Sequence, residues 1–233
     1  MTATVGKSDS VERQKTGCGS MIRFVTRKWP PAIGGMETYS FKLSRALLQH
    51  APVEVIALPG RPDGSPPSTA ALLAFGLRAA MKLLTARDTR GTVHVADMAS
   101  WPLAFAARLR SRRWRLALSA HGTDVSYPLR GGLKGSVYGA YLRLGARCLR
   151  PAVVIANSTA TADCVRRYGF GHVVVVPLAT DMRPAGPAGR PGSFVLFAGR
   201  LIDGRAHGPL TDRSATPPAR IWRISPAPSC SRI

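Results

Sequence analysis

The feature that most constrains this sequence is a regular alternation of short β-branched runs with helix-length amphipathic segments. This alternation is typical of βαβ units, which build a parallel sheet. We therefore expect an α/β fold, a Rossmann-like parallel sheet with helices on both faces that binds ligands at the carboxyl ends of its strands. Strands are predicted at 22–26, 53–58, 92–96, 115–120, 152–156, 173–176 and 194–197, and helices at 36–50, 70–86, 101–110, 133–149 and 159–168.

Changes in composition divide the chain into segments. Residues 1–20 are polar and are predicted to be disordered, whereas residues 21–182 hold the alternating pattern of one Rossmann-like domain. Residues 183–192 read RPAGPAGRPG, a Pro- and Gly-rich composition that predicts a linker. One more strand is predicted within 193–201. From 202 to 233 the periodicity ends, so an unstructured tail is expected.

The chain carries 33 Lys and Arg residues against 12 Asp and Glu, a formal net charge of +21. Such an excess favours anionic partners. One hypothesis is therefore a basic, non-catalytic module that binds nucleic acid or an anionic membrane surface. Clustered arginines support this hypothesis: Arg108, Arg110, Arg112, Arg113 and Arg115, and also Arg143, Arg147 and Arg150. Aromatic residues make up only 7% of the chain and no RRM, KH or zinc-finger pattern is present, which disfavours a specific nucleic-acid partner.

No apolar run reaches the length of a membrane-spanning helix, and the first residues lack the apolar core of a secretion signal. We expect a cytoplasmic protein that can lie peripherally at the inner face of the plasma membrane. Cys18, Cys148, Cys164 and Cys230 are scattered and form no metal-binding pattern. No metal site is predicted.

A paired glycine, Gly34-Gly35, stands between the first predicted strand and the first predicted helix. Glycines let the backbone approach a ligand closely, and the following helix N-terminus presents free N–H groups to an anion. An ordinary strand-to-helix turn explains the same pattern. Glu37 is either part of a site or a first-turn acid stabilised by the helix dipole.

Polar residues follow later strands in the same way. The run His121-Gly122-Thr123-Asp124 is predicted as a strand end followed by a short polar loop, where an imidazole can bind a sugar hydroxyl. Asp124 either orients a ligand hydroxyl or caps the turn. Three more residues follow predicted strands: Asn157, Asp181 and Arg200. Ser158, directly after Asn157, is predicted to cap the next helix. An arginine after a strand can bind a diphosphate with two hydrogen bonds.

In this order and spacing, the motifs resemble retaining glycosyltransferases of the GT-B fold, family 4, over about residues 21–201. The resemblance implies two Rossmann-like domains, of which the N-terminal one mainly holds the acceptor and the C-terminal one most of the sugar nucleotide. It assigns His121 to the transferred sugar as the catalytic residue, and Gly34, Gly35 and Arg200 to the donor phosphates. Loop or acceptor positioning falls to Glu37, Asp124, Asn157 and Asp181.

The implied function is transfer of a hexose from a nucleoside-diphosphate sugar to a glycan or lipid-linked acceptor, in cell-surface polysaccharide or glycolipid biosynthesis. The sugar nucleotide is a co-substrate; no cofactor or metal is implied, because the enzyme stabilises the departing nucleotide electrostatically.

The resemblance ends after Gly199-Arg200-Leu201. Family members continue with a lysine-glycine element and an E-x7-E pair, whereas here Asp203-Gly204-Arg205 follows and no glutamate occurs after Glu54. We therefore expect that 193–201 is the first strand of a missing donor domain and that 202–233 reads like out-of-frame translation. On this hypothesis the chain is truncated and inactive alone.

Overall fold

The structure, a computed structural model, describes residues 20–150 and 152–179 and the short strands at 196–197 and 222–223. The chain divides into two compact units, Met1–Ala179 and Thr180–Ile233. In the second unit β7 (Leu196–Phe197) pairs with β8 (Trp222–Arg223) in antiparallel orientation. No strand was predicted at β8, because two residues leave no periodicity in a sequence. The predicted linker, Asp181 and Arg200 lie outside the described residues.

The first unit is built on a six-stranded sheet in the order β2-β1-β3-β4-β5-β6. All of its neighbouring strands are parallel, which confirms the predicted α/β fold class. The strands are β1 (Ile22–Trp29), β2 (Val53–Pro59), β3 (Gly91–Val95), β4 (Trp114–Ala120), β5 (Val153–Ala156) and β6 (His172–Val175).

The predicted helices form at nearly the predicted positions. They are α1 (Gly35–Leu48), α2 (Thr69–Leu84), α3 (Trp101–Arg110), α5 (Gly132–Cys148) and α6 (Thr159–Arg167). Three further short helices were not predicted: η1 (Met98–Ser100), α4 (Gly122–Ser126) and η2 (Tyr127–Arg130). The polar loop expected after His121 is therefore wrong, because a helix of five residues is too short to show a hydrophobic period.

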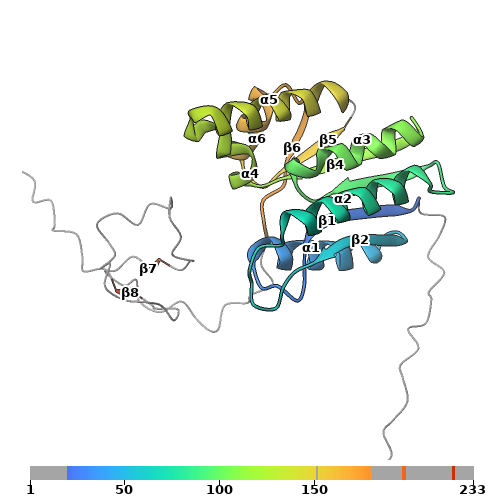
Figure 1. Ribbon diagram of the computed structural model, residues 1–233, viewed down its shortest axis with the longest axis horizontal. Coiled ribbons are helices and arrows are strands. Elements are labelled where there is room, and N and C mark those ends of the chain that lie inside the picture. The colour runs from blue at the N-terminus through green and yellow to red at the C-terminus, as the bar shows by residue number, and fades with distance from the viewer. Residues whose placement is uncertain (1–19, 151, 180–195, 198–221, 224–233) are drawn as a thin grey trace, which may run out of the picture. The chain divides into compact units, whose positions relative to one another are not determined.

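Right-handed crossovers place the helices. The chain moves from β1 outward to β2 and then back across β1 to β3, so α1 lies on one face of the sheet and α2 on the other. Figure 1 shows α2, α3 and α5 side by side in one layer. Val25, Val95 and Leu118 point into the core below this layer, where they join Phe75 of α2.

Helix caps encoded in the sequence set where two of these helices start. The Ser68 hydroxyl accepts a hydrogen bond from the Ala71 N–H at 3.2 Å at the start of α2. Ser158 does the same for the Thr161 N–H at 3.2 Å at the start of α6, which confirms the predicted cap. No helix among the described residues is long and apolar enough to cross a membrane.

Candidate functional site

The carboxyl ends of the central strands bring the predicted motifs to one edge of the sheet. Val25 of β1 lies opposite Val95 of β3, and Ala120 of β4 lies opposite Ala156 of β5. The residues that follow these strands therefore emerge side by side. We call this edge the carboxyl edge.

A partly buried ion pair lies at the centre of the carboxyl edge. Asp97, which follows β3 and is fully buried, accepts a hydrogen bond from Arg27 Nε of β1 at 3.1 Å. The same carboxylate caps η1 by accepting from the Ser100 N–H at 3.0 Å. Burial lowers the pKa of the Arg27 guanidinium, but the charge and hydrogen bond of Asp97, with smaller contributions from Tyr138 and Asp124, raise it overall. The edge thus holds a fixed cation whose side chain is about one-third exposed.

Asp124 joins two of the loops at this edge. Its Oδ1 accepts from the His121 N–H at 2.8 Å, and its Oδ2 accepts from the Met98 N–H at 3.0 Å. Burial, together with the negative charge of Asp97, raises the pKa of Asp124 to about 7 although both backbone bonds favour the carboxylate. Asp124 is therefore a loop-positioning residue that ties the β4–α4 turn to η1, and its carboxyl titrates near neutrality.

His121 lies in the middle of this arrangement and is only 7% exposed. Its Nε2 is 3.1 Å from the Ala96 carbonyl oxygen, to which it donates when that nitrogen carries the proton. Burial lowers the pKa of the imidazole, although the Ala96 bond and the charge of Asp97 act the other way. The ring packs edge-on against Tyr39 of α1, with centroids 4.9 Å apart. His121 thus links the end of β4 to the residue after β3 and to α1, and it also lies at the carboxyl edge.

A chain of hydrogen-bonded hydroxyl and imidazole groups joins Tyr39, Ser119 and His94. The Tyr39 hydroxyl lies 3.1 Å from the Ser119 hydroxyl, which lies 2.9 Å from His94 Nε2. Burial, reinforced by the neighbouring His121, lowers the pKa of His94 to about 4. His94 is therefore neutral at physiological pH. Its contact with Ser119, and that of Ser119 with Tyr39, connect α1 to β3 and β4, which end at the site.

Two tyrosines of α5 border the acidic centre. The Tyr141 hydroxyl donates to the Ala99 carbonyl, and burial with the charge of Asp97 raises its pKa to about 12. Burial and the charges of Asp124 and Asp97 likewise raise the pKa of Tyr138. Both phenols remain protonated donors at neutral pH.

The paired glycine lies at the start of α1, one turn before Tyr39. Gly34 is the N-cap with an extended backbone at φ −175°, so this backbone conformation does not itself require glycine. A side chain at Gly35 would meet no atom within 4 Å, which leaves the first turn of the helix open to a ligand. Glu37 in that turn pairs with Lys28 Nζ at 3.6 Å and so joins the helix to the end of β1.

Asn157 follows β5 at the same edge. Its N–H donates to the Ala120 carbonyl at 3.4 Å, next to His121. Its side-chain oxygen accepts from the Thr161 hydroxyl at 2.7 Å, which holds the start of α6. The structure therefore brings Gly34, Gly35, Glu37, His121, Asp124 and Asn157 to one edge of the sheet. Asp181 and Arg200, the other two predicted site residues, lie outside the described residues.

Sequence reasoning missed Arg27, Asp97, Tyr138 and Tyr141 as members of this site. Asp97 comes directly after a predicted strand, as His121 does, so the same position rule was available for it. Arg27 gave no such signal, because the observed β1 extends beyond the predicted strand end at residue 26.

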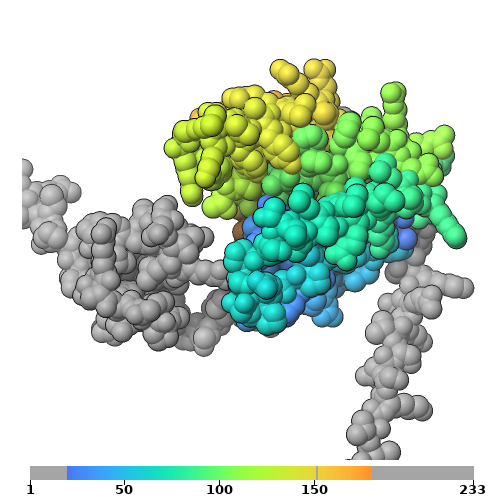
Figure 2. Space-filling model, in the orientation of Figure 1, coloured from blue at the N-terminus to red at the C-terminus, as the bar shows by residue number. Residues whose placement is uncertain are grey.

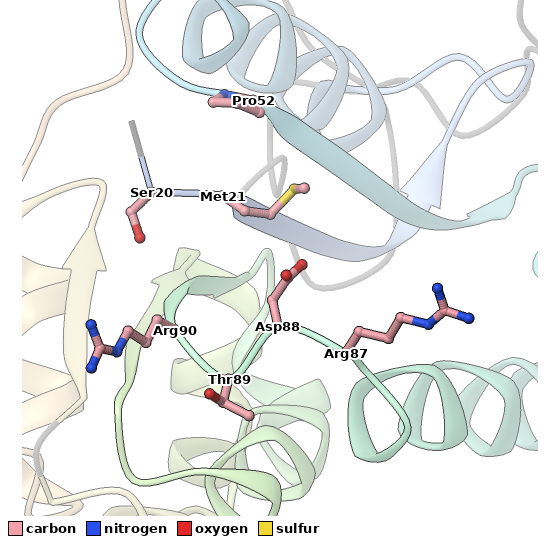
Figure 3. A pocket seen from close by; sticks show the side chains of 7 residues that line it. All are labelled: Ser20, Met21, Pro52, Arg87, Asp88, Thr89 and Arg90. Atoms are coloured by element: carbon pink, nitrogen blue, oxygen red, sulfur yellow. The ribbon is translucent and has the colours of Figure 1, made fainter. Parts of the chain in front are cut away.

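The opposite edge of the sheet has a shallow hollow of about 530 Å³ beside residues that precede β1, β2 and β3. Figure 3 shows Arg87 and Arg90 of this hollow pointing away from each other. Asp88 there is engaged by Arg23 at 3.2 Å. The hollow therefore has no converging donors for an anion. In the described part of the chain, no group of three or more His, Cys, Asp or Glu residues is placed to hold a metal ion.

A parallel Rossmann-like sheet with a polar, hydrogen-bonded carboxyl edge defines a ligand-binding α/β domain. The sequence model described as Glycosyltransferase Family 4 matches residues 33–183, more than half of the chain. The chain belongs to this family.

Among solved structures, one similar protein is HepE from Anabaena, crystallised in complex with UDP and glucose. It is 18% identical to this chain with a TM-score of 0.44, and the match covers 70% of this chain and 45% of HepE. The chain therefore spans less than half the length of that protein. No curated protein sequence matches it.

Proposed function

We propose that this chain supplies the acceptor-side, N-terminal domain of a GT-B glycosyltransferase. The reaction moves a hexose from a nucleoside-diphosphate sugar to a glycan or lipid-linked acceptor, in the synthesis of a cell-surface polysaccharide or glycolipid. The observation that carries the proposal is the family match over 33–183, the same residues that bring His121, Asp124 and the start of α1 to the carboxyl edge.

The chemistry available at this edge fits sugar transfer. Loss of the nucleoside diphosphate leaves positive charge on the sugar ring and negative charge on the leaving oxygen. The α1 N-terminus and Arg27 offer positive potential, whereas Asp97 and Asp124 offer negative potential and hydrogen-bond acceptors. The proposal assigns the transferred sugar to His121 and the donor phosphates to Gly34 and Gly35.

Asp124 and Glu37 act as positioning residues in this proposal. Asp124 holds His121 through its backbone N–H, and Glu37 holds the first turn of α1 against Lys28. Asn157 positions the neighbouring strand end, while Asp181 and Arg200 are proposed as further acceptor and diphosphate contacts. The sugar nucleotide is the co-substrate, and no other cofactor is part of the proposal. A cytoplasmic location follows from the need for a sugar nucleotide.

The test is binding of glycan and lipid-linked acceptors and of UDP sugars to the purified full chain, because the sequence predicts that this chain is inactive alone. His121→Ala is expected to weaken binding of the sugar ligand by about tenfold, because one hydrogen bond to the sugar is lost. Binding is measured by titration calorimetry, and transfer from radiolabelled UDP sugars is assayed in parallel.

The matched control is His172→Ala. This exposed histidine begins β6 at the opposite edge of the sheet, so its removal is expected to leave binding unchanged. Equal binding by His121→Ala and the wild type would refute the site. A wild-type chain that neither transfers sugar nor binds nucleotide or acceptor would refute the function.

A further inference from the structure

One helix of the sheet-covering layer has an apolar outer face. Along α2, Leu73, Leu77 and Met81 recur every fourth residue and expose between 53% and 70% of their surface. Leu84 continues the stripe at the end of the helix. The opposite face of α2 is already buried, since Phe75, Ala79 and Leu83 belong to the core. The core of the domain therefore does not use this outer stripe. We call Leu73, Leu77, Met81 and Leu84 the α2 ridge.

The neighbouring helices have the same character. On α5, Leu133, Val137 and Leu144 are exposed, and on α3 Leu109 is exposed. Figures 1 and 2 show α2, α3 and α5 next to one another on one side of the domain. The exposed apolar side chains thus lie on adjacent helices. Single exposed apolar residues are common on protein surfaces, whereas a group of them marks an interaction surface.

The charge on these helices has one sign. The sequences of α2, α3 and α5 contain no Asp or Glu. Their cations are Arg78, Lys82, Arg108, Arg110, Lys134, Arg143 and Arg147. Lys82 is paired with Glu54 of β2 at 2.9 Å, so the charge of the layer rests mainly on the arginines and Lys134.

We propose that the layer of α2, α3 and α5 docks on an anionic lipid bilayer, with the α2 ridge inserted at the level of the headgroups. Exposed Leu and Met together with Arg and Lys, without acids, are typical of helices that lie in the membrane interface. Long basic side chains reach the phosphates while their stems stay among apolar groups. Each cation near an anionic surface adds to the attraction, which falls off within a Debye length.

Other occupants match only half of this surface. A nucleic acid would satisfy the arginines but would leave the leucines in water, and a neutral apolar partner would leave the cations unpaired. An anionic bilayer offers both an apolar interior and negative headgroups. It therefore complements both the apolar side chains and the cations of the layer.

The docking face adjoins the candidate site. Helices that follow parallel strands start at the carboxyl edge, so α2 and α5 both begin there and run away from it. A bilayer on this layer would place the carboxyl edge beside the headgroups, where a lipid-linked acceptor would be within reach. This consequence for the acceptor rests on the proposed function, whereas the docking itself does not.

The experiment is vesicle flotation with the full chain, on phosphatidylcholine vesicles with and without phosphatidylglycerol. The wild type is expected to bind only the anionic vesicles, and to bind them less as salt is raised. The combined variant Leu73→Ser, Leu77→Ser and Met81→Ser is expected to lose binding by about tenfold or more, because each removes buried apolar area. Arg143→Glu with Arg147→Glu is expected to lose it as well.

The matched control is Leu48→Ser at the end of α1, on the other face of the sheet and 53% exposed. It makes the same chemical change and is expected to leave binding unchanged. Circular dichroism and the melting temperature establish that each variant is folded, and a folded Leu77→Ser single variant replaces the triple variant if the latter unfolds.

Unchanged flotation of the folded ridge variants would overturn the proposal, as would equal binding to neutral vesicles. So would a ridge variant that dissociates a dimer of this chain without changing flotation. Flotation needs no sugar ligand, so docking can stand when the sugar and acceptor binding tests fail, and binding of a soluble glycan can stand when docking fails.

Discussion

Asp124 is the residue whose environment differs most from that of an ordinary surface carboxyl. It is buried next to the carboxylate of Asp97, yet both of its oxygens accept backbone hydrogen bonds. Burial and the neighbouring charge favour the protonated form, whereas the backbone bonds favour the ionised form. The pKa of the Asp124 carboxyl is therefore about 7 in the folded protein.

The pH dependence of stability tests this environment. The folded pKa of about 7 lies above the ordinary value of 3.8, so the folded state binds the extra proton between these values. Its contribution to stability is complete below the ordinary value and is lost as pH rises through 7. The wild type is expected to lose about 2 kcal/mol relative to Asp124→Asn between pH 5 and pH 7. Urea unfolding at several pH values measures the unfolding free energy of both proteins. The same pH dependence in the wild type and in Asp124→Asn would contradict the prediction.

The pH dependence of stability that arises from His94 has the opposite sign. Burial lowers its folded pKa to about 4 from 6.5, so the unfolded state binds the extra proton between these values. The stability is therefore complete above 6.5 and is lost as pH falls toward 4. His94→Gln removes this titration and is expected to reduce the loss of unfolding free energy between pH 7 and pH 5 by about 2 kcal/mol. An equal loss in both proteins would show that His94 is not held neutral.

At the scale of elements, the contact between α3 and α5 depends on a missing side chain. A Cβ at Gly145 of α5 would lie 2.9 Å from the buried ring of Trp101 at the start of α3. The glycine thus lets the two helices approach closely. Helix propensity alone would favour alanine at this position by about 1 kcal/mol.

Paired substitutions separate packing from propensity. Gly145→Ala is expected to destabilise the protein by about 1–3 kcal/mol, because the buried Trp101 ring would have to shift to make room for the methyl group. Gly76→Ala on α2 is the matched control: a Cβ there meets no atom within 4 Å, so a gain of about 0.5–1 kcal/mol is expected. Thermal unfolding of both variants decides the matter. A stabilising Gly145→Ala would mean that α3 and α5 do not pack this closely.

At the scale of the whole molecule, one continuous core supports the candidate site. The buried core cluster runs from Val25 to Phe170 and includes residues from both ends of the sheet. All of its members belong to the unit Met1–Ala179. In the part of the chain that the structure describes, this core holds the carboxyl edge.

A chain that ends at Ala179 tests whether this core is sufficient for folding. It is expected to unfold in one cooperative transition, with an unfolding free energy within about 1 kcal/mol of the full chain, because every described member of the core is retained. Urea unfolding followed by tryptophan fluorescence measures both proteins. A loss of several kcal/mol would show that the second unit stabilises the first.

Most elements of the sheet were predictable, since a strand and a helix each leave a period in the local sequence. Short helices such as α4 left none and were missed. The predicted site was incomplete for a related reason. Position after a strand identified His121, Asp124 and Asn157, but it did not show that the His121 imidazole is buried against Ala96.

The sequence by itself determined the α/β class, the order of its elements and which residues stand at strand ends, because these depend on patterns within a few neighbouring residues. Only the tertiary structure decided the pairing of Arg27 with Asp97, 70 residues apart, and the placing of Tyr138 beside Asp124. The shifted pKa of Asp124 follows from that assembly. Electrostatic contacts and burial depend on distances in space, which the packed sheet and its helices establish together.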